Sequence, residues 1–234
     1  MLLKEAAIKE IDAILVIHSH YDHVMDAPYV ATQTGAKVLG SVSTANVARG
    51  LDLPEAQIET IQNEKSYRFG AFEIHFIPSR HIPLPAWGPA KLGKEIKEPL
   101  RPPARVGAYE EGTSYSIHIR HPEGNILVQG SAGFVEDALR NYPSEVVFLG
   151  IGGLGSQEEP YQEKYLQEML LKTKARRVIP IHWDDFTISL DQGLLPMPYL
   201  ADDLVNSFQK LDQFCRANQL KLEMPRTGIS KPLF

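Results

Sequence analysis

Residues 12–24 read DAILVIHSHYDHV, and this stretch joins a short apolar run to a loop crowded with metal-binding side chains. The run at 12–17, DAILVI, is rich in β-branched residues, a composition typical of a buried strand. It leads directly into the histidines of the loop. Because α/β folds usually place their sites where strands end, the stretch predicts an α/β fold with a functional loop after a strand.

The loop itself, residues 18–23, has the pattern HxHxDH, with three imidazoles and one carboxylate in six positions. In an extended segment His18 and His20 point to the same side, so both can reach one ion. A turn after them lets Asp22 and His23 face a neighbouring ion. The alternative, a histidine-rich surface turn without a ligand, is disfavoured because such density directly after a buried strand is unusual. The pattern therefore predicts two adjacent metal sites.

Predicted strands and helices alternate along the rest of the chain. Periodicity and turn residues predict strands or hairpins in segments 37–41, 67–77, 114–130, 145–151, 176–182 and 221–225. Capping residues and helical spacing predict helices from Asp26 to Gly35, from Ser43 or Thr44 to Gly50, and over 157–173 and 200–217. Since the length of 234 residues fits one domain, we expect residues 1–234 to form a single α/β domain.

Composition narrows the function classes. A net charge of -5 and a pI near 5.9 give no overall positive field for phosphate backbones, so no nucleic-acid partner is expected. Cys215 is the single cysteine, which excludes an internal disulfide and leaves histidine and carboxylate as the metal ligands. The opening MLLKEAAIKE lacks the apolar stretch of a signal peptide, and no apolar run is long enough to span a bilayer. We therefore expect a cytoplasmic protein that acts on small molecules.

In its histidine loop the sequence resembles the metallo-β-lactamase superfamily, whose defining motif is HxHxDH. The resemblance extends over most of the chain, because two later family ligands have counterparts in order and context. These are His81 in IPSRHIP and His182 in VIPIHWDDF. The resemblance implies a four-layer αββα sandwich with the metals at one sheet edge.

The resemblance also implies a ligand set and its metals. One ion would be held by His18, His20 and His81, and the other by Asp22, His23 and His182. One or two divalent ions are expected, zinc first, with manganese and iron as the alternatives. Such ions make hydroxide available from water near neutral pH, and Asp22 is the candidate that both binds metal and accepts a proton.

Further polar residues near the motifs are candidates for orienting the ligands, because metal-bound histidines usually have a hydrogen-bond partner. Tyr21 and Asp184 have this position in the sequence, and a purely structural role is the alternative for both. His75, His118 and His121 fall inside the predicted hairpins, away from strand ends, and we interpret them as structural or exposed.

Two departures from the family pattern bear on the site. The family's bridging aspartate follows a glycine after a strand, whereas ILVQGSAGF has Ser131 there. A serine hydroxyl is a poor metal ligand beside a carboxylate, which predicts weaker binding of the second ion. The strand at 12–17 is preceded by only about ten residues, where the family has several strands. We therefore expect a sandwich lacking some N-terminal strands. Either the chain is a truncated version of a longer protein, or another subunit covers the exposed apolar edge in a homo-oligomer.

Residues 82–112 are rich in proline and glycine and start directly after His81. A loop of this length in a compact domain is usually functional, so we expect a flap over the metals. Trp87 would form an apolar wall for a substrate or anchor the loop. Arg101 and Arg105 belong to a basic excess that suits a phosphorylated small molecule, although a solvated charged loop is the commoner meaning of such a stretch.

Together these features predict a hydrolase that uses metal-activated water on an ester, lactone or phosphodiester. In its HYDH and HWDDF motifs the sequence resembles the broad branch of the superfamily that includes ascorbate-phosphate lactonase and N-acyl-phosphatidylethanolamine phospholipase D. A non-catalytic metal-binding scaffold is the second hypothesis, because Ser131 replaces the bridging carboxylate. A nucleic-acid-processing enzyme is the third, and salt-sensitive binding of RNA or DNA would be needed to support it.

Overall fold

The computed structural model describes residues 8, 10–84, 92–189, 192–225 and 233–234. Contacts divide the chain into two compact units, Met1–Gly70 with Pro83–Tyr115 (unit 1) and Ala71–Ile82 with Ser116–Phe234 (unit 2). Each unit has its own sheet and its own helices. The expectation of one domain over the whole chain stays a prediction.

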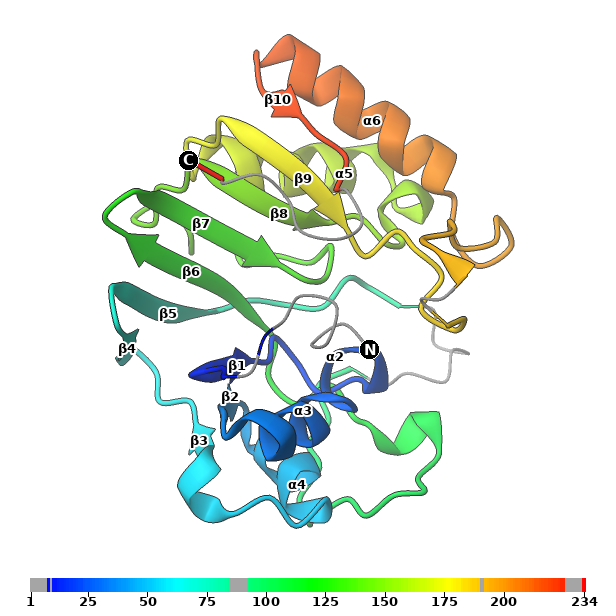
Figure 1. Ribbon diagram of the computed structural model, residues 1–234. Helices are drawn as coiled ribbons and strands as arrows, with labels where there is room; N and C mark the ends of the chain where they lie inside the picture. Colours follow the sequence, from blue (N-terminus) through cyan, green and yellow to red (C-terminus); the bar gives the residue numbers. More distant parts are fainter. Residues whose placement is uncertain (1–7, 9, 85–91, 190–191, 226–232) are drawn as a thin grey trace. The chain divides into compact units, whose positions relative to one another are not determined.

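Unit 1 contains a parallel sheet with helices packed on it (Figure 1). Its strands lie in the order β1 (Ala13–Leu15), β2 (Lys37–Gly40) and β3 (Ile58–Thr60). The helices α3 (Ala27–Thr34) and α4 (Val42–Gly50) both pack on β2. In the described part of the chain β1 has one strand neighbour, so the predicted strand at 12–17 lies at a sheet edge. Self-association through this edge stays a prediction.

Smaller elements complete unit 1. They are α2 (Tyr21–Val24), η1 (Glu55–Gln57), β4 (Ser66–Phe69) and η2 (Val106–Ala108). The strand β3 was not anticipated, because three residues with the sequence IET carry no readable alternation. β3 pairs with β2 in parallel, and this pairing depends on tertiary contacts rather than on a local sequence pattern.

The helix ends in unit 1 test the predicted caps. Asp26 precedes α3 as its N-cap residue, but its side chain makes no capping hydrogen bond. Gly35 ends α3 in the left-handed conformation at φ 77°, as predicted. For α4 the prediction of Ser43 or Thr44 as the N-cap is wrong. The cap is Ser41, whose Oγ accepts a hydrogen bond from the Thr44 N–H at 3.2 Å. The helix begins earlier because Ser41 has an extended backbone and its side chain already satisfies one of the first amides.

Of the predicted flap at 82–112, the structure describes residues 82–84 and 92–112. The longer segment, 92–112, is bound to α4. Ile96 is buried, and its N–H donates to the Ser43 Oγ at 2.9 Å. The carbonyl of Ile96 accepts from the Asn46 Nδ2 at 2.7 Å. This segment is therefore packed into unit 1, while Trp87 lies outside the described residues. A role over the metals stays a prediction.

Unit 2 contains the strands β10-β9-β8-β7-β6-β5, in this order, of a larger, mixed sheet whose last strand is β4 (Figure 1). The strands are β5 (Phe72–Pro78), β6 (Tyr115–His121), β7 (Gly124–Gln129), β8 (Val146–Gly150), β9 (Arg177–Ile181) and β10 (Lys221–Leu222). β6 and β7 form the predicted antiparallel hairpin, and β7 to β10 are parallel neighbours. Because β7, β8 and β9 are parallel, their carboxyl ends meet at one edge, and the loops that follow them lie side by side.

Helices in unit 2 match the predicted segments. α5 (Glu159–Leu166) continues into the π-helical turn η4 (Gln167–Leu171), and α6 (Leu204–Ala217) packs on η3 (Leu154–Ser156) and β10. α6 begins later than predicted because the Asp203 Oδ1 accepts from the Asn206 N–H at 3.1 Å and caps the helix. Among the described residues, none of the helices is long and apolar enough to cross a membrane.

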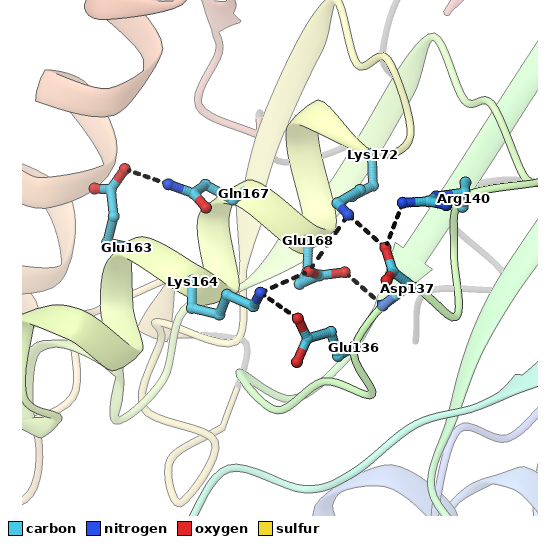
Figure 2. Close-up of polar contacts among 8 residues, drawn as sticks. All are labelled: Glu136, Asp137, Arg140, Glu163, Lys164, Gln167, Glu168 and Lys172. Atoms are coloured by element: carbon cyan, nitrogen blue, oxygen red, sulfur yellow. Dashed lines mark hydrogen bonds and ion pairs between the residues drawn. The ribbon is translucent and has the colours of Figure 1, made fainter.

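A buried carboxylate, Glu168, ties α5 and η4 to the loop that follows β7 (Figure 2). Its side chain is 1% exposed, and its Oε2 accepts from the Asp137 N–H at 2.9 Å. The Nζ atoms of Lys164 and Lys172 lie 3.5 and 4.0 Å from its Oε1. Lys164 also pairs with Glu136 at 2.6 Å, and Lys172 with Asp137. One buried charge is therefore balanced by two lysines that also bind the loop.

Glu168→Gln keeps the size of this side chain but removes the charge between the two lysines. We expect the free energy of unfolding to fall by about 1–3 kcal/mol, because a buried acceptor loses its ionic partners. Urea denaturation measures it. The matched control is Glu163→Gln on the same helix, where the side chain is 43% exposed, and it should change stability by less than about 0.5 kcal/mol. Equal effects from both variants would contradict the assignment of Glu168 as the anchor.

Candidate metal centre

The HxHxDH loop follows β1 in unit 1, and its side chains are gathered closely. His18 is 0% exposed and His20 is 5% exposed. The ring centroids of His18 and His20 are 4.8 Å apart, and those of His18 and His23 are 3.9 Å apart. The His23 Nε2 lies 3.3 Å from the Asp22 Oδ2. Unit 1 therefore brings all four predicted donors of the motif into one small volume.

Ser19, between the first two histidines, anchors the loop to the body of unit 1. Its N–H donates to the Glu111 carbonyl at 2.8 Å. Its hydroxyl lies 3.1 Å from the Ser41 Oγ and 3.1 Å from the Thr44 Oγ1, both at the start of α4. Because side chains alternate along an extended chain, fixing Ser19 against α4 turns both flanking histidines to the opposite side.

The chain then turns, as the motif predicts. His20 has an extended backbone at φ -64° and ψ 153°, and α2 starts directly after it. The helical turn carries His23 back to within ring contact of His18. Neutral imidazoles together with a carboxylate are the donors that zinc and related divalent ions bind. The donor set in unit 1 therefore fits a divalent metal ion.

In unit 2, His81 follows β5, and its ring is oriented by its own backbone. The His81 Nδ1 lies 2.9 Å from the Ile82 carbonyl oxygen. A proton on Nδ1 that is donated to this carbonyl leaves the lone pair on Nε2, which is the tautomer suited to binding a metal. The Ile82 N–H donates to the Ser131 Oγ at 3.0 Å. Ser131 therefore fixes the segment that carries His81.

The backbone of Ser131 is held in turn by Gln129, at the end of β7. The Gln129 Nε2 donates to the carbonyls of Ser131 at 2.6 Å and Gly133 at 2.9 Å, and its Oε1 accepts from the Ser116 hydroxyl. Sequence reasoning missed Gln129. The available signal was an amide at the end of an otherwise apolar strand, which predicts burial with hydrogen-bond partners but does not name them.

His182 follows β9 in a backbone conformation that is rare for a residue with a side chain, at φ 57°. Gly152, after β8, lies against it. A Cβ at Gly152 would be 2.5 Å from the His182 carbonyl oxygen and 2.7 Å from its Nδ1. The Phe186 ring meets the imidazole edge-on with centroids 5.4 Å apart. Close packing therefore restrains both the backbone and the ring of His182.

The remaining site candidates lie at several places. Tyr21 begins α2, and Asp184 forms an isolated backbone bridge with Pro196. Arg101 is in an exposed ion pair of 3.2 Å, and Arg105 directly precedes η2. The orienting roles of Tyr21 and Asp184 and the substrate roles of the two arginines stay predictions.

The hairpin histidines lie within unit 2. His118 is buried, with its Nε2 3.2 Å from the Pro143 carbonyl, and burial lowers the pKa of His118. The His75 Nε2 is 3.5 Å from Glu73, and the ring of His121 pairs with a glutamate at 3.9 Å. These contacts support the interpretation of all three as structural or exposed.

Comparison with known families covers most of these residues. The model of the beta-lactamase superfamily domain matches residues 2–183, which include the HxHxDH loop, His81, Ser131 and His182. The chain belongs to this superfamily. The membership confirms the resemblance inferred from the HxHxDH motif, and it places His81 and His182 inside the matched region.

Curated relatives extend the comparison. A UPF0173 metal-dependent hydrolase of Myxococcus xanthus is 29% identical over 228 residues, which cover 95% of this chain and 69% of the relative. A UPF0173 metal-dependent hydrolase of Pyrobaculum neutrophilum is 23% identical over 181 residues, covering 75% of this chain and 66% of the relative. The chain thus spans about two thirds of the length of these relatives.

Solved structures show the same fold. Igni18, a metallo hydrolase from Ignicoccus hospitalis, superposes with a TM-score of 0.58 at 17% identity, covering 98% of this chain and 82% of the other. At this identity the likeness shows the fold alone. The predicted α/β fold of the metallo-β-lactamase type is confirmed.

Ser131→Ala tests the role of this hydroxyl in holding the His81 segment. The variant leaves the Ile82 N–H without its acceptor, so we expect a loss of about 1–2 kcal/mol in the free energy of unfolding. The Ile82 amide should also exchange its hydrogen faster, as measured by NMR. Ser144→Ala is the control, because that buried hydroxyl donates to the Tyr142 carbonyl at 3.1 Å, away from His81. Unchanged exchange at Ile82 in Ser131→Ala would contradict the assignment.

Proposed function

We propose that this chain is a metal-dependent hydrolase that acts on a small molecule with an ester, lactone or phosphodiester bond. One ion is bound by His18, His20 and His81, and the other by Asp22, His23 and His182. The observation that carries the proposal is the crowding in unit 1, where three imidazoles and a carboxylate of one short loop meet. Zinc is the first candidate, since it prefers imidazole with carboxylate.

Unit 2 supports the same ligand set from its own geometry. His81 has the hydrogen bond from Nδ1 that directs Nε2 to a metal, and His182 is held in a strained backbone conformation against Gly152. Strain of this kind persists where surrounding structure enforces it, and it clusters at functional sites. The names of the curated relatives add support, because both are called metal-dependent hydrolases.

The chemistry follows from the metals and from the residues around them. A divalent ion lowers the pKa of water bound to it towards about 7 and polarises a scissile carbonyl or phosphoryl group. Asp22 is the candidate to accept a proton, because it is the carboxylate of the motif and lies among its imidazoles, with Oδ2 3.3 Å from the His23 Nε2. Arg101 and Arg105 would favour a phosphorylated substrate.

A non-catalytic metal-binding scaffold is the second candidate. It is favoured by Ser131, whose hydroxyl stands where the family has a carboxylate and accepts a hydrogen bond from Ile82. A scaffold would bind ions without metal-dependent turnover of any ester, lactone or phosphodiester. The two candidates therefore differ in turnover and agree in metal content.

The first test is metal content of protein purified without added metal, followed by a hydrolase panel on the same sample. We expect bound divalent metal in the wild type and loss of turnover by at least about 100-fold in His20→Ala and His182→Ala. His121→Ala, a histidine outside the proposed ligand set, is the control and should keep both metal and turnover. Wild-type protein without bound metal, even after incubation with zinc, would overturn the proposal.

The second test concerns the balance between the two ions. Without a bridging carboxylate, we expect the ion with His18, His20 and His81 to bind more tightly than the ion with Asp22, His23 and His182. Repulsion between two dications is offset by an anionic bridge, and a serine hydroxyl supplies none. Ser131→Asp should therefore raise the metal content towards two ions per chain in zinc titrations. Two ions of equal affinity in the wild type would contradict this expectation.

A further inference from the structure

Asp202, on the loop before α6, is a buried carboxylate that the HxHxDH motif does not include. The residue is only 6% exposed. One oxygen, Oδ2, accepts a hydrogen bond from the Gly153 N–H at 2.8 Å. The other oxygen, Oδ1, is buried and has no hydrogen-bond partner among the described residues. Burying an unsatisfied carboxylate oxygen is costly, so this group calls for an explanation.

The Gly152-Gly153 pair connects Asp202 with His182. The first glycine packs on His182 so closely that a Cβ would be 2.7 Å from the imidazole Nδ1. The second glycine, next in the chain, holds the carboxylate through its N–H. Both contacts lie within unit 2, on the loop after β8.

Electrostatics agree with this placement. Burial raises the pKa of the Asp202 carboxyl, and the Gly153 N–H and the charge of His182 act in the opposite direction. The Gly152-Gly153 backbone, which packs on His182 and holds Asp202, keeps the carboxylate near the imidazole. A carboxylate near a ligating histidine is the usual device for fixing the ring and raising the basicity of its ligating nitrogen.

Capping of α6 does not account for Asp202. That role belongs to the next residue, Asp203, whose Oδ1 accepts from the Asn206 N–H at 3.1 Å. The two neighbouring aspartates thus have different surroundings, one at a helix N-terminus and one bound to the Gly153 N–H on the loop after β8. Asp202 also lies beyond residues 2–183, the part of the chain that the superfamily model matches.

We propose that Asp202 is a positioning residue for His182, holding the imidazole ready for the ion it shares with Asp22 and His23. The proposal rests on the proposed function, in which His182 is a ligand. Loss of the carboxylate should lower the affinity for that ion about tenfold to 100-fold, the usual effect of removing the partner of a ligating histidine. The ion held by His18, His20 and His81 should keep its affinity.

The experiment compares Asp202→Asn, Asp202→Ala and the control Asp203→Asn in the full chain. Asparagine at 202 still accepts from the Gly153 N–H, and asparagine at 203 still caps α6. Each asparagine variant therefore removes one charge and keeps one hydrogen bond. Zinc affinity is measured by titration of the metal-free protein against a competing chelator.

We expect Asp202→Asn and Asp202→Ala to lower to the same extent the affinity for the zinc ion bound by Asp22, His23 and His182. Asp203→Asn should bind zinc as the wild type does. A structural role would instead give rescue by asparagine, with only Asp202→Ala impaired, and that result would overturn the proposal. Wild-type zinc affinity in both Asp202 variants would overturn it as well. If the wild type bound no zinc, the proposed function itself would fail, which is a separate outcome.

A second measurement needs no metal. The ring nitrogens of His182 in the metal-free protein report its tautomer through their ¹⁵N chemical shifts. We expect one dominant tautomer in the wild type and in Asp203→Asn, and a mixture in Asp202→Asn, because the carboxylate no longer selects one form. The same tautomer in all three proteins would contradict positioning by Asp202.

Discussion

Burial of polar donors at the ends of strands is the constraint on which the rest of this structure depends. Imidazoles, hydroxyls and amides withdrawn from water need hydrogen-bond partners, and each group left without one costs about 1–3 kcal/mol. The chain meets this demand within each unit. Ser19 is bound by the start of α4 in unit 1, and Gln129 binds two carbonyls of the loop after β7 in unit 2. These bonds fix the backbone on which the candidate ligands stand.

Close backbone approach is the second device, and it depends on glycine. A Cβ at Gly133 would lie 2.1 Å from the Arg80 carbonyl, and one at Gly152 would lie 2.5 Å from the His182 carbonyl. Any larger residue would therefore push the segments of His81 and His182 away from the loops after β7 and β8. Parallel strands bring these loops to one edge, and glycine lets them touch.

Ser131 shows how a departure from a family pattern acquires a physical meaning. As a metal ligand it would be weak, since a neutral hydroxyl competes poorly with carboxylates for a dication. As a hydrogen-bond acceptor it holds the Ile82 N–H, next to His81. The position thus supports the ligand segment through its backbone, and the proposed centre relies more on imidazole than a centre with a bridging aspartate would.

By itself the sequence determined the α/β class, the superfamily and the candidate metal ligands, because each of these follows from patterns of residues close together in the chain. HxHxDH after an apolar run, Gly35 at a helix end and alternation in the hairpins are all local signals. The tertiary structure alone decided the pairing of β3, the packing of residues 92–112 onto α4, and the hydrogen bond between Gly153 and Asp202. Such contacts join residues far apart in the chain, and burial with hydrogen bonding selects them only after the strands have met.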